Sequence, residues 1–298
     1  MDLRKKHWQW LSLLFLSMIW GSSFILMKKG LRSYSSVHVA SLRMFFAWIM
    51  FLPVTFSRLK RLKRHHWGWL ILTGIIGNFL PANLFTLAQT HIDSSLAGIL
   101  NSLTPLFTLV VGLVFFRSHV LLINIVGLLL GLAGAAGLIY DHNVSLADQS
   151  NIYGIFIILA TVLYGFNVNL LKYKLADLDG ITIVSSIFFF IGPLAALTLL
   201  FTGFPEVIRE QGVVWHDLGY IALLSLFGSV VAVTLFNILL KYISPIFATS
   251  VTYIIPVFAI LWGVIDGEHL SADQVLWIFV IFTGVYLVNK QKLVEVGS

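Results

Sequence analysis

The amino-acid sequence predicts an all-α integral membrane protein, with ten transmembrane helices arranged as two inverted five-helix repeats. Three observations predict this fold: an apolar composition, apolar runs of bilayer length, and an internal repeat. Of the 298 residues, 58% are hydrophobic and 11% are charged, whereas soluble domains are typically about 45–50% apolar and about 25% charged. A soluble protein of this composition would have too little polar surface to cover its core.

Ten apolar runs have the length of a membrane span. About 20 apolar residues in a helix cross a bilayer, because each residue adds about 1.5 Å of length. Basic residues precede the first run, but no A-x-A-like cleavage site follows it, which favours a helix over a signal peptide. The predicted spans are Trp8–Met27, Val37–Phe56, Trp67–Ala88, Ser95–Phe116, Val120–Tyr140, Ile152–Leu171, Ile181–Phe201, Leu218–Leu240, Pro245–Ile265 and Ala272–Asn289.

The connections between these runs define two units. The polar stretch Asp141–Asn151 divides the chain into residues 1–142 and residues 151–290, each holding five predicted helices. The longest connection within a unit, Thr202–Asp217, has room for a short surface helix. The other connections are too short to fold alone, so the sequence predicts no soluble domain of any size.

The two units resemble each other in sequence. A shift of 151 positions aligns nine identical residues without a gap, among them Pro105 with Pro256. A shift of 144 aligns Trp20-Gly21 with Tyr164-Gly165. Because each unit has an odd number of helices, the second inserts upside down relative to the first. Inverted repeats recur in secondary transporters, where the substrate site lies near the midplane between the repeats.

The distribution of basic residues predicts the orientation. With a cytoplasmic N-terminus, fourteen Lys and Arg residues fall on the inner side and four on the outer side, as the positive-inside rule requires. Both termini are therefore predicted to be cytoplasmic, in a plasma membrane and most simply a bacterial inner membrane. Topology accounts for the net charge of +6, so no nucleic-acid partner is predicted; the expected partners are the lipid bilayer and a small-molecule substrate.

The chain resembles the EamA-type family of drug/metabolite transporters over nearly its whole length. The motifs that carry the resemblance are Trp20-Gly21-Ser22-Ser23-Phe24, Lys28, Arg43 with Ala47, Gly127 and Gly134, Pro256-Val257-Phe258-Ala259, Gly263, Gly267-Glu268 and Gly284. One departure is clear: the family often has Gly-Glu after the fourth helix, where this chain has Phe116-Arg117. The resemblance implies ten helices, alternating access, and a cavity lined by helices 1, 3, 4, 6, 8 and 9. Relatives carry amino acids, sugars, nucleotide-sugars or drugs, so the resemblance leaves the substrate open.

Polar side chains within the spans are the candidate substrate-binding residues. An unpaired amide in hydrocarbon costs several kcal/mol on alkane scales, so these side chains should face protein or a water-filled cavity. Each has two interpretations, a substrate contact or a hydrogen bond between helices. The predicted substrate-binding residues are Trp20, Ser23, Asn78, Asn83, Asn101, Tyr164, Asn167, Asn237, Thr252 and Tyr253.

Two prolines are predicted to act in gating. Pro105 and Pro256 lie near mid-span in equivalent helices, and a proline inside a helix removes one hydrogen bond and displaces the carbonyl four residues earlier. Broken backbone at membrane depth is tolerated where protein or a cavity satisfies it. The kinks therefore either bend as gates beside the substrate or serve helix packing alone.

Charged residues set expectations about the substrate. No Asp or Glu lies in the interior of a predicted span, since Asp273 is only the second residue of the last one. This argues against a proton-exchanging carboxylate and against dicationic substrates. Arg43 is the one cation well inside a span; it either binds a substrate anion or extends to the headgroups or a backbone carbonyl, and the second is favoured. Lys28 and Lys172 are interpreted as interfacial anchors, and Glu268 as a loop or gate residue.

These observations predict a transporter rather than an enzyme. The chain has no Cys and no H-x-x-x-H, D-D-x-x-D or G-x-S-x-G motif, so no catalytic residue, metal or cofactor is predicted. The expected function is export of a small neutral, zwitterionic or anionic metabolite, with amino acids as the first candidates. A membrane enzyme acting on a lipid or prenyl substrate is the alternative, and a channel is a third. The protein is expected to be a monomer or a homodimer.

Overall fold

A computed structural model describes residues 3–116, 122–139, 150–269 and 271–288. In these ranges every regular element is a helix. Two of the helices, α7 (Leu122–Ile139) and α15 (Ala272–Val288), contain shorter apolar stretches. The segments that are long and apolar enough to cross a membrane are Lys6–Gly30, Ser36–Leu59, Arg64–Ala88, Ser94–Phe116, Gly154–Lys174, Gly180–Phe201, Trp215–Leu239 and Pro245–Ile265. The all-helical membrane fold is confirmed, and the count of ten spans stays a prediction.

Several spans are divided into consecutive helices, whereas others, such as α1 and α2, are single helices. The elements of the first half are α1 (Lys6–Gly30), α2 (Ser36–Leu59), α3 (Arg64–Gly74), η1 (Ile75–Phe79), α4 (Leu80–Ala88), α5 (Ser94–Asn101), α6 (Thr104–Phe116) and α7. In the second half they are η2 (Ser150–Tyr153), α8 (Gly154–Lys174), α9 (Gly180–Phe201), α10 (Phe204–Gln211), α11 (Trp215–Leu223), η3 (Leu224–Val231), α12 (Ala232–Leu239), α13 (Pro245–Thr249), η4 (Ser250–Tyr253), α14 (Ile255–Ile265) and α15. The short helix α10 occupies the connection in which the sequence left room for one.

The two halves break their helices at equivalent positions. Both η1 and η3 are π-helical, and a shift of 151 places residues 75–79 on residues 226–230, inside η3. The same shift places the start of α6 on the start of α14. π-helical turns are rare and frequently mark functional sites, so their paired occurrence indicates that both halves use the same local distortion.

The paired prolines begin helices instead of bending continuous ones. Pro105 is the second residue of α6 and Pro256 the second residue of α14, each just after a break in its span. A proline is tolerated in the first turn of a helix, where its missing N–H would have no intrahelical partner. The expectation of mid-helix kinks is therefore wrong in form, although both spans are interrupted at the predicted depth.

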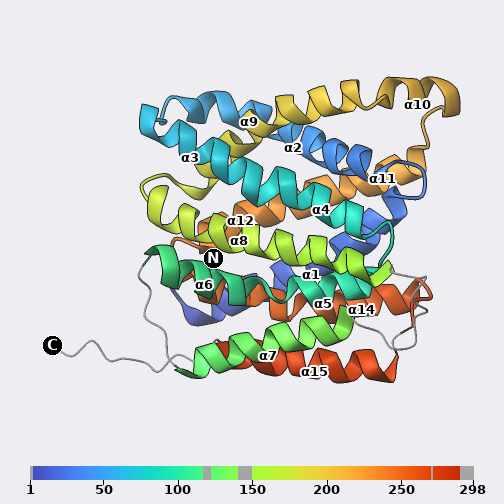
Figure 1. Ribbon diagram of the computed structural model, residues 1–298. Coiled ribbons are helices and arrows are strands. Elements are labelled where there is room, and N and C mark those ends of the chain that lie inside the picture. Colours follow the sequence, from blue (N-terminus) through green and yellow to red (C-terminus); the bar gives the residue numbers. More distant parts are fainter. Residues whose placement is uncertain (1–2, 117–121, 140–149, 270, 289–298) are drawn as a thin grey trace.

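The helices of the two halves interlock into one bundle. α2 packs along α9 and α7 along α15, while α1 contacts α12 and α14, and α8 contacts α4 and α6. Figure 1 shows α7 and α15 together along one edge of the bundle, with α2, α3, α9 and α10 at the opposite edge. Two hydrophobic cores run through the bundle, and each draws buried side chains from both halves.

The glycines of α7 serve packing inside the bundle. A Cβ added to Gly284 of α15 would lie 2.4 Å from the backbone nitrogen of Gly131 and 2.6 Å from the carbonyl oxygen of Gly127. A Cβ on Gly134 would lie 2.8 Å from the side chain of Ile281. The small residues therefore let α7 and α15 approach closely.

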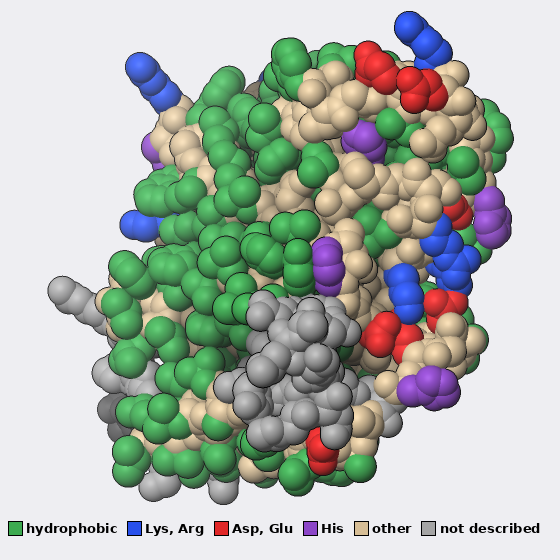
Figure 2. Space-filling model, turned by 45° about the vertical axis from the view of Figure 1, so that its right-hand side comes forward, with side chains coloured by type: hydrophobic (Ala, Val, Ile, Leu, Met, Phe, Trp, Pro, Cys, Tyr) green, Lys and Arg blue, Asp and Glu red, His purple; other side chains and the backbone are tan. Residues whose placement is uncertain are grey.

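The outer surface is apolar over a broad band. Figure 2 shows hydrophobic side chains across the middle of one face and charged side chains gathered toward its ends. Large apolar side chains such as Phe201, Leu129 and Val114 are more than half exposed. Such a surface suits contact with lipid rather than water.

Candidate functional site

A central cavity lies where the broken helices of the two halves meet. It has a volume of about 120 Å³, well above the roughly 10–15 Å³ that one water molecule requires. Its lining residues belong to α1, η1, α4, α5, α6, α8, α12, α13, η4 and α14, and one residue of α9 and two residues of α2 also line it. The six predicted spans that the resemblance implies, numbers 1, 3, 4, 6, 8 and 9 in chain order, therefore all line the cavity. The second and seventh spans, which are α2 and α9, contribute as well.

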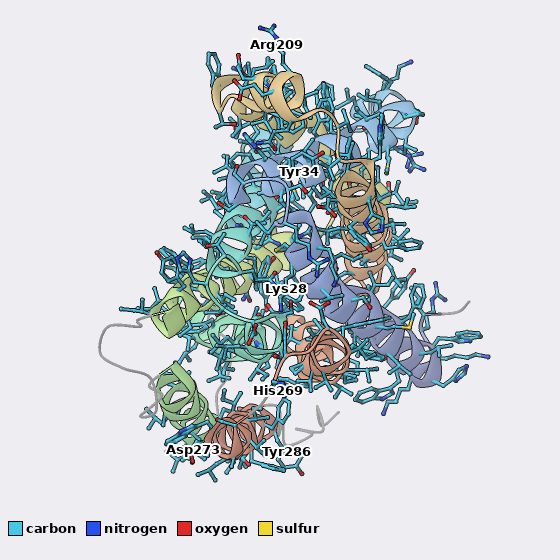
Figure 3. All side chains as sticks on the ribbon, turned by 90° about the vertical axis from the view of Figure 1, so that its right-hand side faces the viewer. Lys28, Tyr34, Arg209, His269, Asp273 and Tyr286 are labelled. Atoms are coloured by element: carbon cyan, nitrogen blue, oxygen red, sulfur yellow. The ribbon has the colours of Figure 1, made fainter. Side chains whose placement is uncertain are left out.

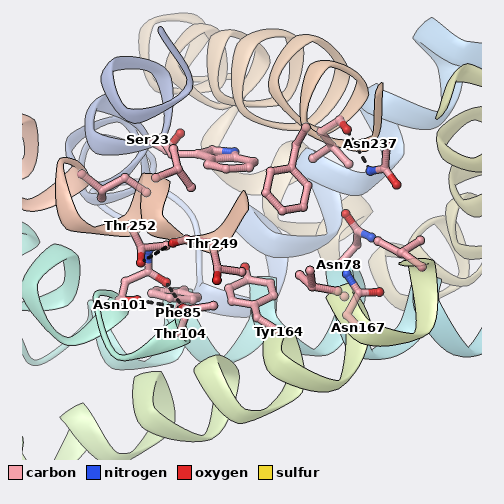
Figure 4. Close-up of a pocket in the computed structure, with 18 of the residues that line it drawn as sticks. Ser23, Asn78, Phe85, Asn101, Thr104, Tyr164, Asn167, Asn237, Thr249 and Thr252 are labelled. Atoms are coloured by element: carbon pink, nitrogen blue, oxygen red, sulfur yellow. Dashed lines mark hydrogen bonds between the residues drawn. The ribbon is translucent and has the colours of Figure 1, made fainter. Parts of the chain in front are cut away.

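Most of the predicted substrate-binding residues meet in this cavity. Those that line it are Trp20, Ser23, Asn78, Asn101, Tyr164, Asn167, Asn237 and Thr252. Figure 4 shows Asn78, Asn167 and Asn237 on one side of the cavity and Asn101, Thr104 and Thr252 on the other. Thr104 and Thr249 also line it, although they were not among the predicted set.

Four predicted positions are not among the lining residues. Asn83 donates from Nδ2 to the carbonyl oxygen of Phe79, 2.8 Å away, and so satisfies the backbone where η1 meets α4. Tyr253 packs against the hydrophobic core. Pro105 and Pro256 are buried in the first turns of α6 and α14. Each proline directly follows a lining residue, Thr104 or Ile255. The helix breaks before the prolines therefore lie at the cavity.

The lining residues come from equivalent positions of the two halves. A shift of 144 pairs Trp20 with Tyr164 and Ser23 with Asn167, and all four line the cavity. A shift of 151 likewise pairs Asn101 with Thr252, Phe85 with Phe236 and Gly77 with Gly228; of these six only Gly228 is not a lining residue. The cavity is therefore built around the relation between the two halves and not within one of them.

Arg43 lines the cavity, contrary to the interpretation favoured from the sequence. Its Nε donates to the hydroxyl of Ser229, 2.8 Å away, and its carbonyl oxygen accepts a hydrogen bond of 2.8 Å from Ser225. The guanidinium thus turns into the bundle toward η3 and not outward to the headgroups. The sequence signal was its position deep inside a span, but the direction of the side chain depends on the packing of α2 against η3.

Two buried amide oxygens in the cavity lack hydrogen-bond partners within the described part of the chain. Asn237 donates from Nδ2 to the carbonyl oxygen of Val233 at 2.9 Å, which fixes the orientation of its amide, and its Oδ1 has no donor. The Oδ1 of Asn167 also has none. Asn237 is 4% exposed and Asn167 is 8% exposed. Buried polar atoms are usually satisfied, so these two acceptors lack the donor that such atoms normally have.

Comparison with known proteins decides the family. The sequence profile of the EamA-like transporter family matches residues 8–140 and again residues 151–290. The chain belongs to the EamA-like transporter family. The resemblance inferred from its motifs is confirmed, and the match to both halves agrees with the internal repeat.

Relatives of this EamA-family chain are named as transporters. The uncharacterized inner membrane transporter YedA of Escherichia coli strain K12 is 29% identical over 294 residues, covering 94% of this chain and 90% of YedA. An uncharacterized transporter of Archaeoglobus fulgidus is 24% identical over 290 residues, covering 95% of this chain and 99% of the relative. A crystal structure of a protein with 15% identity superposes with a TM-score of 0.67, covering 96% of this chain and 97% of that one. That likeness shows a shared fold.

One end of the EamA-family bundle is joined by ion pairs and hydrogen bonds around Glu268. This end, here called the Lys28 end, is viewed in Figure 3, which places Lys28 near its centre. The Oε1 of Glu268 accepts from Lys28 Nζ at 2.7 Å and from the backbone N–H of Ser94 at 3.0 Å. Its Oε2 accepts from Ser95 twice, from the backbone N–H at 3.0 Å and the hydroxyl at 2.6 Å. Glu268 thereby caps the N-terminus of α5, a position that favours a negative charge.

The glycines of the Gly263–Gly267 segment let Glu268 reach that position. Gly267 has a φ of +92°, which turns the chain back after α14. A Cβ on Gly263 would lie 2.2 Å from Glu268 Oε2, so the carboxylate rests against this glycine. Burial raises the pKa of Glu268, but hydrogen bonds from Lys28 and Ser95 outweigh it and hold the pKa below its ordinary value. The carboxylate is therefore ionised at neutral pH.

Further ion pairs surround this contact. Lys28 lies 3.5 Å from Asp93 and 3.7 Å from Asp266, and Asp266 also pairs with Lys29. The cluster joins α1, the start of α5 and the end of α14, which belong to different halves. Lys28 is thus a half-buried member of an ion cluster around the buried Glu268, beyond the interfacial anchor that the sequence predicted.

The opposite end, here called the Lys172 end, is built differently. Lys172 Nζ donates to the carbonyl oxygens of Leu240 and Ile243, at 2.7 and 2.9 Å. The position equivalent to Glu268 is Arg117, which lies outside the described residues. A second cavity of about 220 Å³ lies here and shares Leu171 and Asn237 with the central cavity. Within the described chain the central cavity thus borders a second cavity toward the Lys172 end.

One cluster with metal-ligating side chains has a structural explanation. His65, His66 and Asp177 bring their ligand atoms within 4.8 Å of one another. His66 Nδ1 accepts a hydrogen bond of 3.0 Å from the backbone N–H of Lys63, and its Nε2 lies 2.8 Å from Asp177 Oδ2. Both ring nitrogens of His66 are therefore used, one at the start of α3 and the other in joining α3 to the connection between α8 and α9.

Proposed function

We propose that this EamA-family protein is a secondary transporter that carries a small neutral, zwitterionic or anionic metabolite by alternating access. Amino acids are the first candidates, and export is the proposed direction. The observation that supports it most is the central cavity, whose lining residues come from equivalent positions of the two halves. A site shared by two related halves can face either side of a membrane when the halves rock against each other.

The difference between the two ends supports alternating access. The Lys28 end is closed by ion pairs and by the Glu268 cap on α5, whereas the Lys172 end holds the second cavity. If the halves are inverted repeats with cytoplasmic termini, the Lys28 end faces outward and this conformation is closed to the outside. The reverse conformation would break the ion cluster and close the Lys172 end.

The chemistry of the lining favours binding over catalysis. Among the described residues that line the cavity there are amides, hydroxyls, aromatic rings and one guanidinium, but no carboxylate and no imidazole. Acid–base or metal-assisted chemistry on a lipid would need such groups. The missing carboxylate also disfavours dicationic substrates, and aromatic residues such as Trp20 and Phe85 suit a substrate with an apolar side chain.

The proposed orientation makes a topology prediction. Reporter tags placed at residue 1 and at residue 298 should both report the cytoplasm, because the basic residues concentrate on that side. A tag inserted within residues 141–151 should report the opposite side. In bacteria, paired phosphatase and fluorescent-protein fusions measure this directly. A cytoplasmic signal from the 141–151 insertion would refute the inverted five-plus-five arrangement.

Transport in proteoliposomes tests the site. Saturable counterflow of a radiolabelled amino acid is expected for the wild-type protein. Asn101→Ala and Thr252→Val should each weaken substrate binding by about fivefold or more, because a lost hydrogen bond costs roughly 1–1.5 kcal/mol. Matched controls are Asn83→Ala and Thr198→Val, which remove the same groups outside the cavity lining. If well-folded variants at 101 and 252 keep wild-type affinity and rate, these residues do not bind the substrate.

A further inference from the structure

The cavity holds a cation for which the described part of the chain supplies no counter-ion. Arg43 is the one Lys or Arg side chain among the described residues that line it, and none of the lining residues is Asp or Glu. Within the described chain, the guanidinium has a single hydrogen bond, from Nε to Ser229. A charged side chain at membrane depth costs about 2.5–3.5 kcal/mol on insertion scales, and buried charges are normally paired.

The guanidinium is held in a fixed direction. Ser229 accepts from its Nε and Ser225 donates to the Arg43 carbonyl oxygen, both at 2.8 Å. These two serines belong to the π-helical η3, so the distortion of the helix brings them to α2. With Nε engaged, the terminal nitrogens keep the planar donor pair that binds carboxylates.

The charge of the cavity is asymmetric. The position equivalent to Arg43 under the shift of 144 is Ile187, which also lines the cavity. The relation between the halves therefore supplies no second cation. One guanidinium neutralises one negative charge, so the lining suits a monoanionic carboxylate better than a phosphate dianion.

The unpartnered amide oxygens complete the site. Asn237 Oδ1 and Asn167 Oδ1 are buried acceptors without donors in the described chain, and both residues line the same cavity as Arg43. A ligand that brings N–H or O–H groups would supply the donor that each of these oxygens lacks. We propose, resting on the transporter function above, that the cavity binds a small monocarboxylate carrying an amino or hydroxyl group, with the carboxylate on Arg43 and the donor group on Asn237 and Asn167.

A set of leucine analogues separates these contacts. The probes are L-leucine, 2-hydroxy-4-methylpentanoate, 4-methylpentanoate, leucine methyl ester and isoamylamine, each tested as a competitor and as a counterflow substrate in proteoliposomes. Leucine and its hydroxy analogue should bind best. Loss of the carboxylate, in the ester and the amine, should weaken binding about tenfold or more, as expected for a hydrogen-bonded charge pair. Loss of the donor, in 4-methylpentanoate, should weaken it about fivefold.

Variants connect each contact to its residue. Arg43→Gln should abolish the difference between leucine and its methyl ester, and Asn237→Leu should abolish the difference between leucine and 4-methylpentanoate. Arg209→Gln, which removes an exposed cation on α10, should change neither. If Arg43→Gln does not fold, the preference for carboxylates in the wild-type protein still decides the proposed class of substrate.

The outcomes are distinct. Equal transport of leucine and its ester by the wild-type protein, or a carboxylate preference that survives Arg43→Gln, overturns the assignment of Arg43. Counterflow restricted to the ester or the amine does the same but leaves the carrier function standing. If no probe is bound or carried, the proposed class of substrate is wrong. Failure of any solute, including amino acids and sugars, to show saturable counterflow would refute the transporter function itself.

Discussion

Replacing Glu268 with alanine should destabilise the protein by on the order of 3 kcal/mol, the range measured when one partner of a buried ion pair is removed. Glu268 is 6% exposed. Its carboxylate accepts hydrogen bonds from Lys28, Ser94 and Ser95, and alanine leaves these donors at the start of α5 without their acceptor. Thermal unfolding in detergent measures the loss. Glu210→Ala, which removes an exposed acid on α10, should have little effect.

The same carboxylate makes stability depend on pH in one direction. The pKa of Glu268 in the folded protein lies below its ordinary value of 4.5. Its ionised form therefore stabilises the fold at pH values above about 4.5, and this contribution is lost as the pH falls through the folded pKa. Because Asp266 and Asp179 also have lowered pKa values, the informative quantity is the difference between wild type and Glu268→Gln. That difference should shrink as the medium is acidified, and a difference independent of pH would contradict the assignment.

Loss of Glu268 should also expose the cavity from the Lys28 end. The chain has no cysteine, so Ser23→Cys, at a lining position, gives a single reactive thiol. A membrane-impermeant maleimide applied from the side of the Lys28 end should label this thiol faster when Glu268 is replaced by alanine. Equal labelling rates in a folded variant would mean that the ion cluster does not hold this end closed.

The sequence predicted the lining of the central cavity best where residue type alone was informative. An amide such as Asn101 or Asn167 inside an apolar run has few places to go except a cavity or another helix, and both line the cavity. The internal repeat extended this reasoning, since Trp20 and Tyr164 were found as a pair. Asn83 does not line the cavity because its amide bonds the backbone four residues earlier, an arrangement that residue type does not distinguish from a cavity contact.

The features that the sequence did not reveal depend on how the helices pack against one another. Arg43 turns inward because the π-helical η3 presents Ser225 and Ser229 to α2, and no local signal in the sequence marks a π-helical turn. Similarly, a proline near mid-span predicts a disturbed helix but does not distinguish a kink from a new start, as at Pro105. Such features depend on which helices meet, which is set by contacts between residues more than 100 positions apart.

Substituting alanine for Gly21 and Gly165 should produce the second large effect. The two glycines are equivalent under the shift of 144 and lie beside Trp20 and Tyr164 of the cavity lining. A Cβ on Gly21 would lie 2.5 Å from the Cβ of Phe258 and 2.9 Å from the carbonyl oxygen of Ile255. A Cβ on Gly165 would lie 2.7 to 2.9 Å from backbone atoms of Phe107 and Thr108. Real Cβ atoms do not approach backbone so closely, so α1 must move from α14, and α8 from α6.

The expected cost is about 1–3 kcal/mol for each substitution, the range for added methyl groups in a packed core. Counterflow should fall as well, because displacement of α1 or α8 moves the adjacent aromatic ring in the cavity. Gly68→Ala and Gly219→Ala provide the matched control, since these glycines are also equivalent between the halves and a Cβ on either would meet nothing within 4 Å. These two substitutions, in α3 and α11, should stabilise the protein, because alanine is favoured over glycine within a helix by up to about 1 kcal/mol. Thermal unfolding and counterflow of all four variants test this contrast, and similar effects at the two pairs would show that the close helix crossings at Gly21 and Gly165 do not limit stability.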